Sequence, residues 1–200
     1  MPRIEKVSLV LAALIAAAGF SPCANAQETT IEARTTVLLP EGVAPPLRIE
    51  TPDFKLVPLG PALAKIDYDA YMSSIEHLQK TFTRSTSWPH AGITDAEAMT
   101  DMQTEQARFA QRKSFAYAVL TPDGKRERGC VYVQPSPVAG YDAAVLMWVT
   151  RTEYDAGFDK DLQAWVMQWI ARDWPFKKVA YPGRTISWEK WDALVPAKAH

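Results

Sequence analysis

Three apolar segments in the second half of the chain follow one another like the strands of a β-meander. They cover residues 114–120, 129–134 and 143–149. Between the first two, Pro122 presets the first position of a turn, and Gly124 can adopt the left-handed conformation that closes a hairpin. Odd and even positions of the first segment are both apolar, so neither face of that strand suits contact with water. The pattern therefore predicts a central antiparallel sheet that is covered on both faces.

Helix-forming stretches flank this meander. Residues 67–82 place apolar side chains three and four positions apart, as an amphipathic helix does. A second helix is expected over 94–112, because Thr94 and Glu97 form a capping box that satisfies free backbone amides. A third helix is expected over 157–174, where a Trp-Pro pair ends it. Together these elements predict an α/β (α+β) fold, with helices packed on a mixed, mainly antiparallel sheet.

Shorter elements complete the predicted domain. Residues 47–59 alternate apolar and polar side chains on both sides of Pro52, as an edge strand with a break would. Residues 178–181 are typical of a short strand and residues 187–194 of a brief capped helix. Residues 27–46 show no sustained period, so we expect a linker or irregular arm there.

Length and charge limit the function classes. At 200 residues the chain is long enough for one domain with a real core and too short for two of ordinary size. We place that single domain at 47–194 and a tail at 195–200. The formal net charge is −1 and the basic residues are scattered, so a nucleic-acid partner is not expected. The sequence leaves the oligomeric state open.

The first 26 residues have the pattern of a secretory signal peptide. Arg3 and Lys6 precede an apolar run over 7–20, and Ala24-Asn25-Ala26 matches the small-x-small site of signal peptidase. The run is shorter than the about 18 apolar residues that a membrane span needs, which disfavours an uncleaved anchor. We therefore expect cleavage between Ala26 and Gln27, a periplasmic or secreted protein, and no stable membrane insertion afterwards.

The two cysteines predict neither lipidation nor a disulfide. Cys23 lies in the signal segment, and Phe20 and Pro22 stand where a lipobox requires an aliphatic and a small residue. Cleavage leaves Cys130 alone, so the processed domain can form no internal disulfide. Cys130 falls inside a strand pattern, which favours a small buried hydrophobe over a reactive thiol.

Several chemistries lack their usual residues. The three histidines, His77, His90 and His200, and one remaining cysteine do not form a zinc cluster at any standard spacing, so no metal site is predicted. His77 lies at the edge of a helical stripe, where a surface or structural role is expected. The fingerprints of serine hydrolases, P-loop proteins and dinucleotide-binding proteins are also missing from the sequence.

Five tryptophans in the last part of the chain allow two interpretations. They are Trp165, Trp169, Trp174, Trp188 and Trp191. Aromatic faces can stack on sugars, so a carbohydrate platform is one interpretation. Core packing is favoured, because two of the five share the helical stripe that must pack on the sheet.

The junction at 150–157 is the candidate site that chemistry alone suggests. There the third strand of the meander runs into a helix, whose first turn exposes unpaired N–H groups and the positive end of the dipole. Such an arrangement favours phosphate. The alternative is an ordinary strand-to-helix loop that contains a glycine for tightness.

At this junction the chain resembles the GNAT superfamily of acyl-CoA-dependent N-acetyltransferases. The order of elements agrees over residues 49–194. The opening at 49–59 and the residues Met147-Trp148-Val149, Glu153-Tyr154 and Gly157 are similar to the branch that acetylates protein N-termini. Stretches similar to an uncharacterised group of the superfamily are 129–133, 174–176 and 181–184.

The resemblance implies transfer of an acyl group from acetyl-CoA to the amine of a small molecule or peptide. It implies that backbone groups of Trp148 and Val149 orient the thioester carbonyl. Amides around Gly157 and Phe158 would hold the pyrophosphate, and Arg151 would add a charge-assisted contact.

The catalytic residues that the resemblance implies depart from the family pattern. Glu153, acting through water, is the implied base, and Tyr181 is the nearest counterpart of the usual tyrosine acid. The glutamate often found on the fourth strand corresponds to Ala144. Of the cofactor-binding glycine pattern only Gly157 fits, and the carboxylate of Asp159 stands near the expected phosphates, which it would repel.

The predicted export of the domain conflicts with a cofactor, acetyl-CoA, that is cytosolic. Three alternative explanations therefore stay open. The domain could be an exported, non-catalytic relative that binds another ligand. It could use a different acyl donor, or the signal could belong to an unusual start site. The transferase hypothesis further requires that the corner at 148–158 is not plugged by side chains, and that a gap wide enough for a pantetheine arm separates the strands at Met147 and Lys178.

Overall fold

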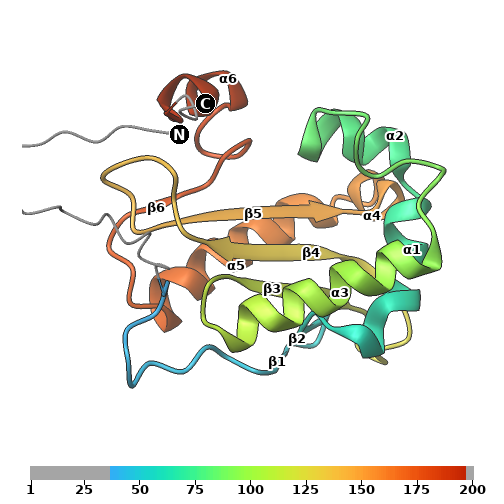
Figure 1. Cartoon of the computed structure of the whole chain (residues 1–200), viewed down its shortest axis with the longest axis horizontal. Coiled ribbons are helices and arrows are strands. Elements are labelled where there is room, and N and C mark those ends of the chain that lie inside the picture. Colours follow the sequence, from blue (N-terminus) through green and yellow to red (C-terminus); the bar gives the residue numbers. More distant parts are fainter. Residues whose placement is uncertain (1–36, 197–200) are drawn as a thin grey trace, which may run out of the picture. The chain divides into compact units, whose positions relative to one another are not determined.

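A six-stranded sheet runs through residues 37–196, the part of the chain that this computed structural model describes (Figure 1). The strands are β1 (Ile49–Glu50), β2 (Lys55–Pro58), β3 (Phe115–Leu120), β4 (Glu127–Gln134), β5 (Ala143–Val149) and β6 (Val179–Ala180). Their spatial order follows the chain, and every pair is antiparallel except β5–β6, which is parallel. The predicted fold class is confirmed. The predicted signal peptide and its cleavage site lie outside the described residues.

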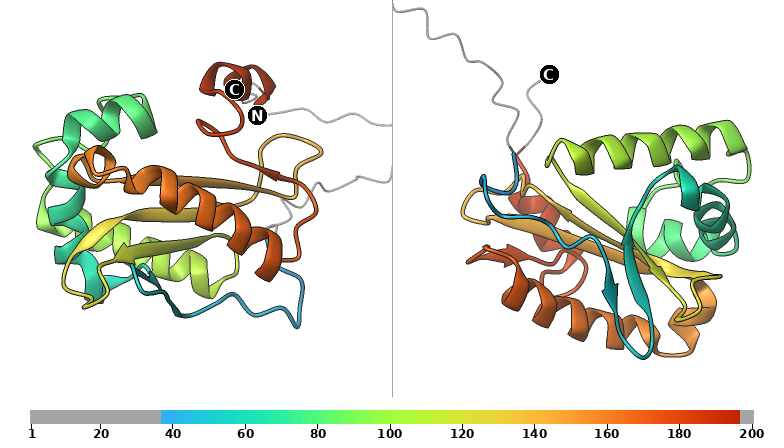
Figure 2. Two further views of the ribbon diagram at one scale, coloured as in Figure 1. Left: turned by 180° about the vertical axis from the view of Figure 1, so that it is seen from behind. Right: turned by 90° about the horizontal axis from the view of Figure 1, so that it is seen from below.

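Helices cover both faces of this sheet. They are η1 (Pro61–Leu63), α1 (Ala64–Met72), α2 (Ile75–Leu78), the π-helical turn η2 (Gln79–Thr83), α3 (Asp95–Ala110), α4 (Arg151–Asp155), α5 (Phe158–Asp173) and α6 (Trp188–Leu194). The right-hand view of Figure 2 shows the sheet between α3 on one face and α5 on the other. None of the helices within residues 37–196 is long and apolar enough to cross a membrane.

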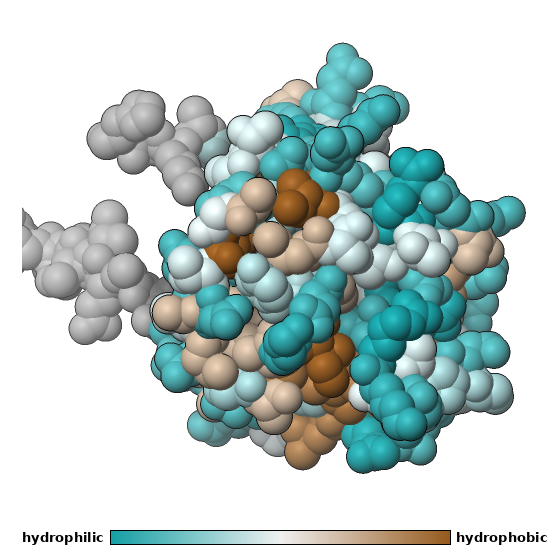
Figure 3. Space-filling view, turned by 90° about the vertical axis from the view of Figure 1, so that its right-hand side faces the viewer, coloured by the Kyte–Doolittle hydropathy of each residue, from teal (hydrophilic) through white to brown (hydrophobic). Residues whose placement is uncertain are grey.

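Two apolar cores explain why the strands of the meander are apolar on both faces. All six positions of β3 are buried. Phe115, Tyr117 and Val119 pack with α5, whereas Ala116 and Ala118 pack with α1 and α3. On the face shown in Figure 3, hydrophobic residues reach the surface as separate spots among hydrophilic ones. The apolar residues of the meander strands are therefore used mainly for packing within the domain.

Three of the five tryptophans, Trp165, Trp169 and Trp174, pack in the core beneath α5, and Trp188 and Trp191 pack in a third, smaller apolar cluster. Trp169 has an exposed fraction of 0%, and its ring meets that of Tyr117 edge-on at 5.5 Å. Trp174 and Trp191 are also buried, and Trp165 and Trp188 are partly buried. A solvent-facing row of indole rings, which a sugar platform requires, is therefore not formed by these five residues.

The predicted helix over 67–82 is wrong as one continuous element. It breaks after α1, where Ser73 donates its hydroxyl hydrogen bond to the carbonyl of Ala70 at 2.6 Å. Ser74 instead accepts a hydrogen bond from the amide of Arg151 at 2.9 Å. Serine side chains compete with helical hydrogen bonds in this way, and the chain resumes as α2 and the π-helical turn. The break directs α2 toward the end of β5.

The N-terminal segments also differ from the expected elements. The proposed edge strand over 47–59 is a hairpin of β1 and β2, because the Thr51 hydroxyl accepts from the amide of Phe54 at 3.0 Å and closes a turn. Residues 37–46, from the expected irregular arm, contain no helix or strand but pack on the domain. Leu39 is buried there, and Arg112 donates to three carbonyls of this segment.

A β-bulge in β4 places a polar cluster inside the core. Val119 pairs with Gly129 but Leu120 pairs with Glu127, so Arg128 is the extra residue. Without it, Glu127 and Cys130 would point to opposite faces. With it, the Cys130 thiol donates to Glu127 Oε1 at 2.9 Å, and Cys130 Sγ lies 3.6 Å from Asp67 Oδ1 on α1.

This cluster of Asp67, Glu127 and Cys130 is closed to solvent. The exposed fractions are 4%, 1% and 0%. Burial, and then the neighbouring carboxylates, raise the pKa of Cys130, so the thiol stays protonated and unreactive. The expectation of a buried Cys130 is confirmed, but two acidic neighbours replace the purely apolar surroundings that were expected.

Gly129 is required where β4 crosses β5. A Cβ atom on this residue would lie 2.0 Å from the carbonyl oxygen of Trp148, a backbone atom that cannot move aside. We predict that Gly129→Ala lowers the free energy of unfolding by at least about 3 kcal/mol, measured by chemical denaturation followed by circular dichroism. Gly60→Ala is the control, because its Cβ meets only the flexible side chain of Gln106 at 3.2 Å. Equal stability of the two variants would contradict the account of β4–β5 packing.

The buried cluster predicts a stability that falls as pH rises. Burial raises the pKa of Asp67 to about 6, so between about pH 4 and pH 6 the folded chain binds more protons than the unfolded chain. Stability is therefore lost across this window, by about 2–3 kcal/mol for this group. We predict that Asp67→Asn raises the free energy of unfolding, relative to wild type, more at pH 7.5 than at pH 4. Denaturation curves of both proteins at both pH values measure this difference. Asp69→Asn, on the exposed side of α1, is the control. If the free energy of unfolding changes with pH by the same amount in wild type and in Asp67→Asn, the prediction is wrong.

Candidate functional site

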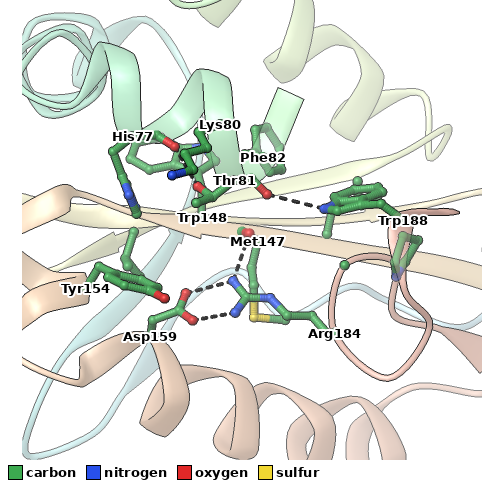
Figure 4. Close-up of a pocket in the computed structure, with 14 residues that line it drawn as sticks. His77, Lys80, Thr81, Phe82, Met147, Trp148, Tyr154, Asp159, Arg184 and Trp188 are labelled. Carbon is green, nitrogen blue, oxygen red and sulfur yellow. Dashed lines mark hydrogen bonds and ion pairs between the residues drawn. The ribbon is translucent and has the colours of Figure 1, made fainter. Parts of the chain in front are cut away.

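The candidate site lies where β5 and β6 separate. The two strands pair only at Ala143–Val179 and Ala144–Ala180. Beyond these pairs a pocket of about 260 Å³ opens between them (Figure 4). It is lined by His77, Lys80, Thr81, Phe82, Leu146, Met147, Trp148, Val149, Tyr154, Asp159, Pro182, Gly183, Arg184 and Trp188. The strands therefore separate at Met147 but not at Lys178, whose carbonyl still accepts a hydrogen bond from the amide of Asp142 at 2.8 Å. That the gap admits a pantetheine arm stays a prediction.

Four parts of the chain form the walls of this pocket. The α2–η2 segment supplies His77 and Lys80 on one side, and β5 supplies its free edge. The loop after β6 supplies Arg184. At the far end the indole N–H of Trp188 on α6 donates to the carbonyl of Thr81 at 3.3 Å, which ties α6 to η2. The pocket thus joins segments that are about a hundred residues apart in the sequence.

An ion pair crosses the gap. The guanidinium of Arg184 donates to both carboxylate oxygens of Asp159, to Oδ1 at 2.7 Å, and also to the carbonyl of Met147 at 3.3 Å. The side chains of Arg184 and Asp159 are only 17% and 15% exposed. The carboxylate that was expected to repel phosphate is therefore neutralised by an arginine that could itself bind an anion.

The predicted phosphate corner is partly filled by side chains. At the start of α4 the amide of Arg151 donates to the hydroxyl of Ser74 at 2.9 Å, and the amide of Glu153 donates to the hydroxyl of Thr150 at 3.4 Å. These two amides are consequently not free to bind a ligand. The second helix of the corner, α5, begins after Gly157, whose φ of 84° lets the chain reverse between the helices.

The sequence-predicted cofactor residues separate into two groups. Trp148 and Val149 line the pocket. Arg151, Gly157 and Phe158 do not: Arg151 pairs with Asp155 at 2.8 Å on the surface, and Phe158 is buried beneath the guanidinium of Arg128. Their roles as cofactor ligands stay predictions.

Glu153 is held in an ion-pair network away from the pocket. It accepts hydrogen bonds from Arg128 at 2.6 and 2.9 Å and pairs with Arg126 at 2.8 Å. Burial alone would raise its pKa, but the two arginines hold the pKa below its usual value. In this arrangement Glu153 is ionised and joins α4 to β4.

Tyr181 lies next to the pocket rather than in it. The residue is 7% exposed and belongs to the core beneath α5. Burial raises the pKa of its hydroxyl to about 12, so the hydroxyl is protonated at neutral pH. Tyr181 is not among the residues that line the pocket, and its role as the acid stays a prediction.

His77 is a pocket residue whose position the sequence pattern did not reveal. Its ring lies 4.9 Å from that of Tyr154 and faces the end of β5 (Figure 4). Burial, and then the charge of Arg151, lower the pKa of His77, which leaves a neutral imidazole at pH 7. The helix break at Ser73 and Ser74 sets its direction, so helical spacing gave no signal of it.

One group of residues among 37–196 brings three ligand atoms of the kinds that bind metals together. The ligand atoms of Asp67, Glu127 and Cys130 lie within 4.8 Å of one another. Their positions, sixty residues apart, follow no standard metal-binding spacing. They lie in the core beneath α1 and not in the pocket.

Comparisons with known proteins show the fold. No family model and no curated protein matches the sequence. Several solved structures are similar, among them three acetyltransferases. One is assigned as a ribosomal-protein-serine acetyltransferase, from Vibrio cholerae, with 16% identity, a TM-score of 0.50, and coverage of 65% of this chain and 70% of that one. A ribosomal-protein-S5-alanine acetyltransferase from Vibrio fischeri has 12% identity, a TM-score of 0.51, and coverage of 62% and 67%. The microcin C7 self-immunity acetyltransferase MccE, solved with acetyl-CoA and AMP, has 12% identity, a TM-score of 0.50, and coverage of 68% and 73%.

These similarities are of architecture and not of sequence. At such low identity they extend to the arrangement of the sheet and its helices, and residue roles do not follow from them. The mixed, mainly antiparallel sheet with helices on both faces is thus a fold that these acetyltransferases also have.

Proposed function

We propose that this protein binds an acyl-CoA thioester between β5 and β6 and transfers the acyl group to an amine. The observation that carries the proposal is the open edge of β5. Because the N–H and C=O of one residue point to the same side of a strand, the Met147 amide faces the pocket as its carbonyl does. A backbone N–H placed there can donate to a thioester oxygen as negative charge develops on it.

The pocket also contains groups that suit the rest of the reaction. An amine attacks only when it is neutral, and His77 is a neutral base at the same edge of the sheet. Lys80 and Arg184 supply positive charge for phosphate groups. In the transfer, the C–N bond forms, the C–S bond breaks, and the proton lost by the amine passes through His77 to the leaving thiol. A bound CoA would supply the thioester, and the chain would supply position and charge.

A non-catalytic, exported ligand-binding module is the second candidate. It is favoured by one contact, because Arg184 occupies the Met147 carbonyl and closes the gap by its pair with Asp159. In that case the pocket binds an anionic ligand through Arg184, without acyl transfer. The proposed export of the domain also fits this candidate, since acetyl-CoA is cytosolic.

Calorimetric titration of the full chain with acetyl-CoA tests the binding step. Asp159→Asn removes a carboxylate from the pocket and keeps Arg184, so we expect it to bind acetyl-CoA about tenfold more tightly than wild type. Asp161→Asn is the matched control, because it removes the same charge from the same turn of α5 without lining the pocket. An absence of heat at millimolar ligand, for both wild type and Asp159→Asn, would remove the acyl-CoA site.

The pH dependence of acyl transfer tests His77. We expect kcat/KM with an amine acceptor to rise steeply with pH below 6.5, where both the imidazole and the acceptor lose a proton, and less steeply above it, where only the acceptor still does. His77→Gln should lower the rate about a hundredfold and remove the steep limb. His90→Gln, in an exposed loop, is the control. An unchanged limb in His77→Gln would show that another group is the base.

A further inference from the structure

A second pocket adjoins the first on the face of the sheet that α3 covers. It has a volume of about 310 Å³ and shares two wall residues, Phe82 and Leu146, with the pocket between β5 and β6. Leu146 pairs with Tyr132 across β4–β5, which fixes the floor of the second pocket at the middle of the sheet. Nothing in the proposed reaction uses this cavity so far.

Three aromatic rings form one side of the second pocket. The rings of Phe82 and Tyr132 are stacked with centroids 5.8 Å apart, and Trp88 meets Phe82 edge-on at 6.2 Å. All three residues line the cavity. The faces of such rings attract cations, most strongly where water is excluded.

Two carboxylates from α3 form the opposite side. Asp101 and Glu105 lie one helical turn apart and both line the pocket. Glu105 pairs with Arg108 at 2.9 Å, whereas Asp101 forms no ion pair within residues 37–196. Asp101 is exposed and Glu105 is partly buried, and partial desolvation raises the pKa of both carboxyl groups. A cation bound beside them would favour their ionised forms. With Arg108 included, the formal charge of this wall is −1.

We infer that the second pocket binds a cationic group of the acyl acceptor, and that the acceptor is a small molecule with two basic nitrogens. This inference rests on the proposed transferase function. The nitrogen that attacks the thioester must be neutral, so it cannot be the one that carboxylates and aromatic rings hold as a cation. The shared wall of Phe82 and Leu146 allows one molecule to extend from one pocket into the other.

The two pockets differ in charge, and this difference decides which nitrogen stays protonated and which attacks. The anchored ammonium remains protonated between Asp101 and the ring of Trp88. The other nitrogen reaches the edge of β5, where His77 accepts its proton as the C–N bond forms and the thiol leaves. A monoamine of the same length has one nitrogen, which can be anchored as a cation in the second pocket or attack from the first pocket, but cannot do both.

Binding of 1,5-diaminopentane to the full chain, compared with the uncharged pentane-1,5-diol, tests this inference. Calorimetric titration without acetyl-CoA should give at least about tenfold tighter binding of the diamine. The double variant Asp101→Asn/Glu105→Gln should lose this preference. Glu41→Gln, an exposed acid that lines neither pocket, changes net charge without touching the site and should keep the preference. Thermal denaturation confirms that each variant is folded.

The outcomes separate this inference from the transferase proposal. Equal affinities for the diamine and the diol, or a preference that persists in the double variant, would overturn the inference. If acetyl-CoA binds to wild type and to the double variant alike while the diamine preference is absent, the transferase proposal stands and the acceptor class is wrong. If the diamine is preferred through Asp101 and Glu105 but acetyl-CoA does not bind, the cation pocket stands and the transferase proposal fails.

Discussion

The free edge of β5 is the constraint on which the site depends. A strand that stops pairing exposes backbone N–H and C=O groups that need partners, and β5 stops pairing with β6 after Ala144. In this structure Arg184 satisfies one of them, the carbonyl of Met147. A ligand with amide groups and phosphates could satisfy the same edge and the same arginine. The pocket is therefore a place where the fold requires some partner for its backbone.

The charged side chains in and around the pocket form two separate sets of ion pairs. Glu153 is held by Arg126 and Arg128, and this network joins α4 to the bulge of β4 without reaching the pocket. Arg184 and Asp159 form a partly buried pair that a competing anion can separate, since Arg184 would keep a negatively charged partner. The first network joins α4 to β4, and the second lies across the unpaired edge of β5.

The two pockets suit different substrates of the proposed reaction. The first has cations and a backbone edge, which suit an anionic thioester, and the second has aromatic rings and carboxylates, which suit a basic acceptor. They meet at Phe82, in the π-helical turn that follows the break at Ser73 and Ser74. A local interruption of helical hydrogen bonding thus shapes the boundary between the two proposed ligands.

The sequence by itself determined the strands of the meander, the capping box at Thr94 and the helix that begins after Gly157, because these depend on local periodicity and turn chemistry. It also placed Trp148 and Val149 at the site. Only the tertiary structure decided that Glu153 faces two arginines, that Arg184 crosses to Asp159, and that His77 faces β5. These contacts join residues far apart in the chain, and a one-residue bulge or a serine break reverses which side chains meet. Periodicity fixes which face of its own element a residue occupies, but packing alone fixes what lies opposite.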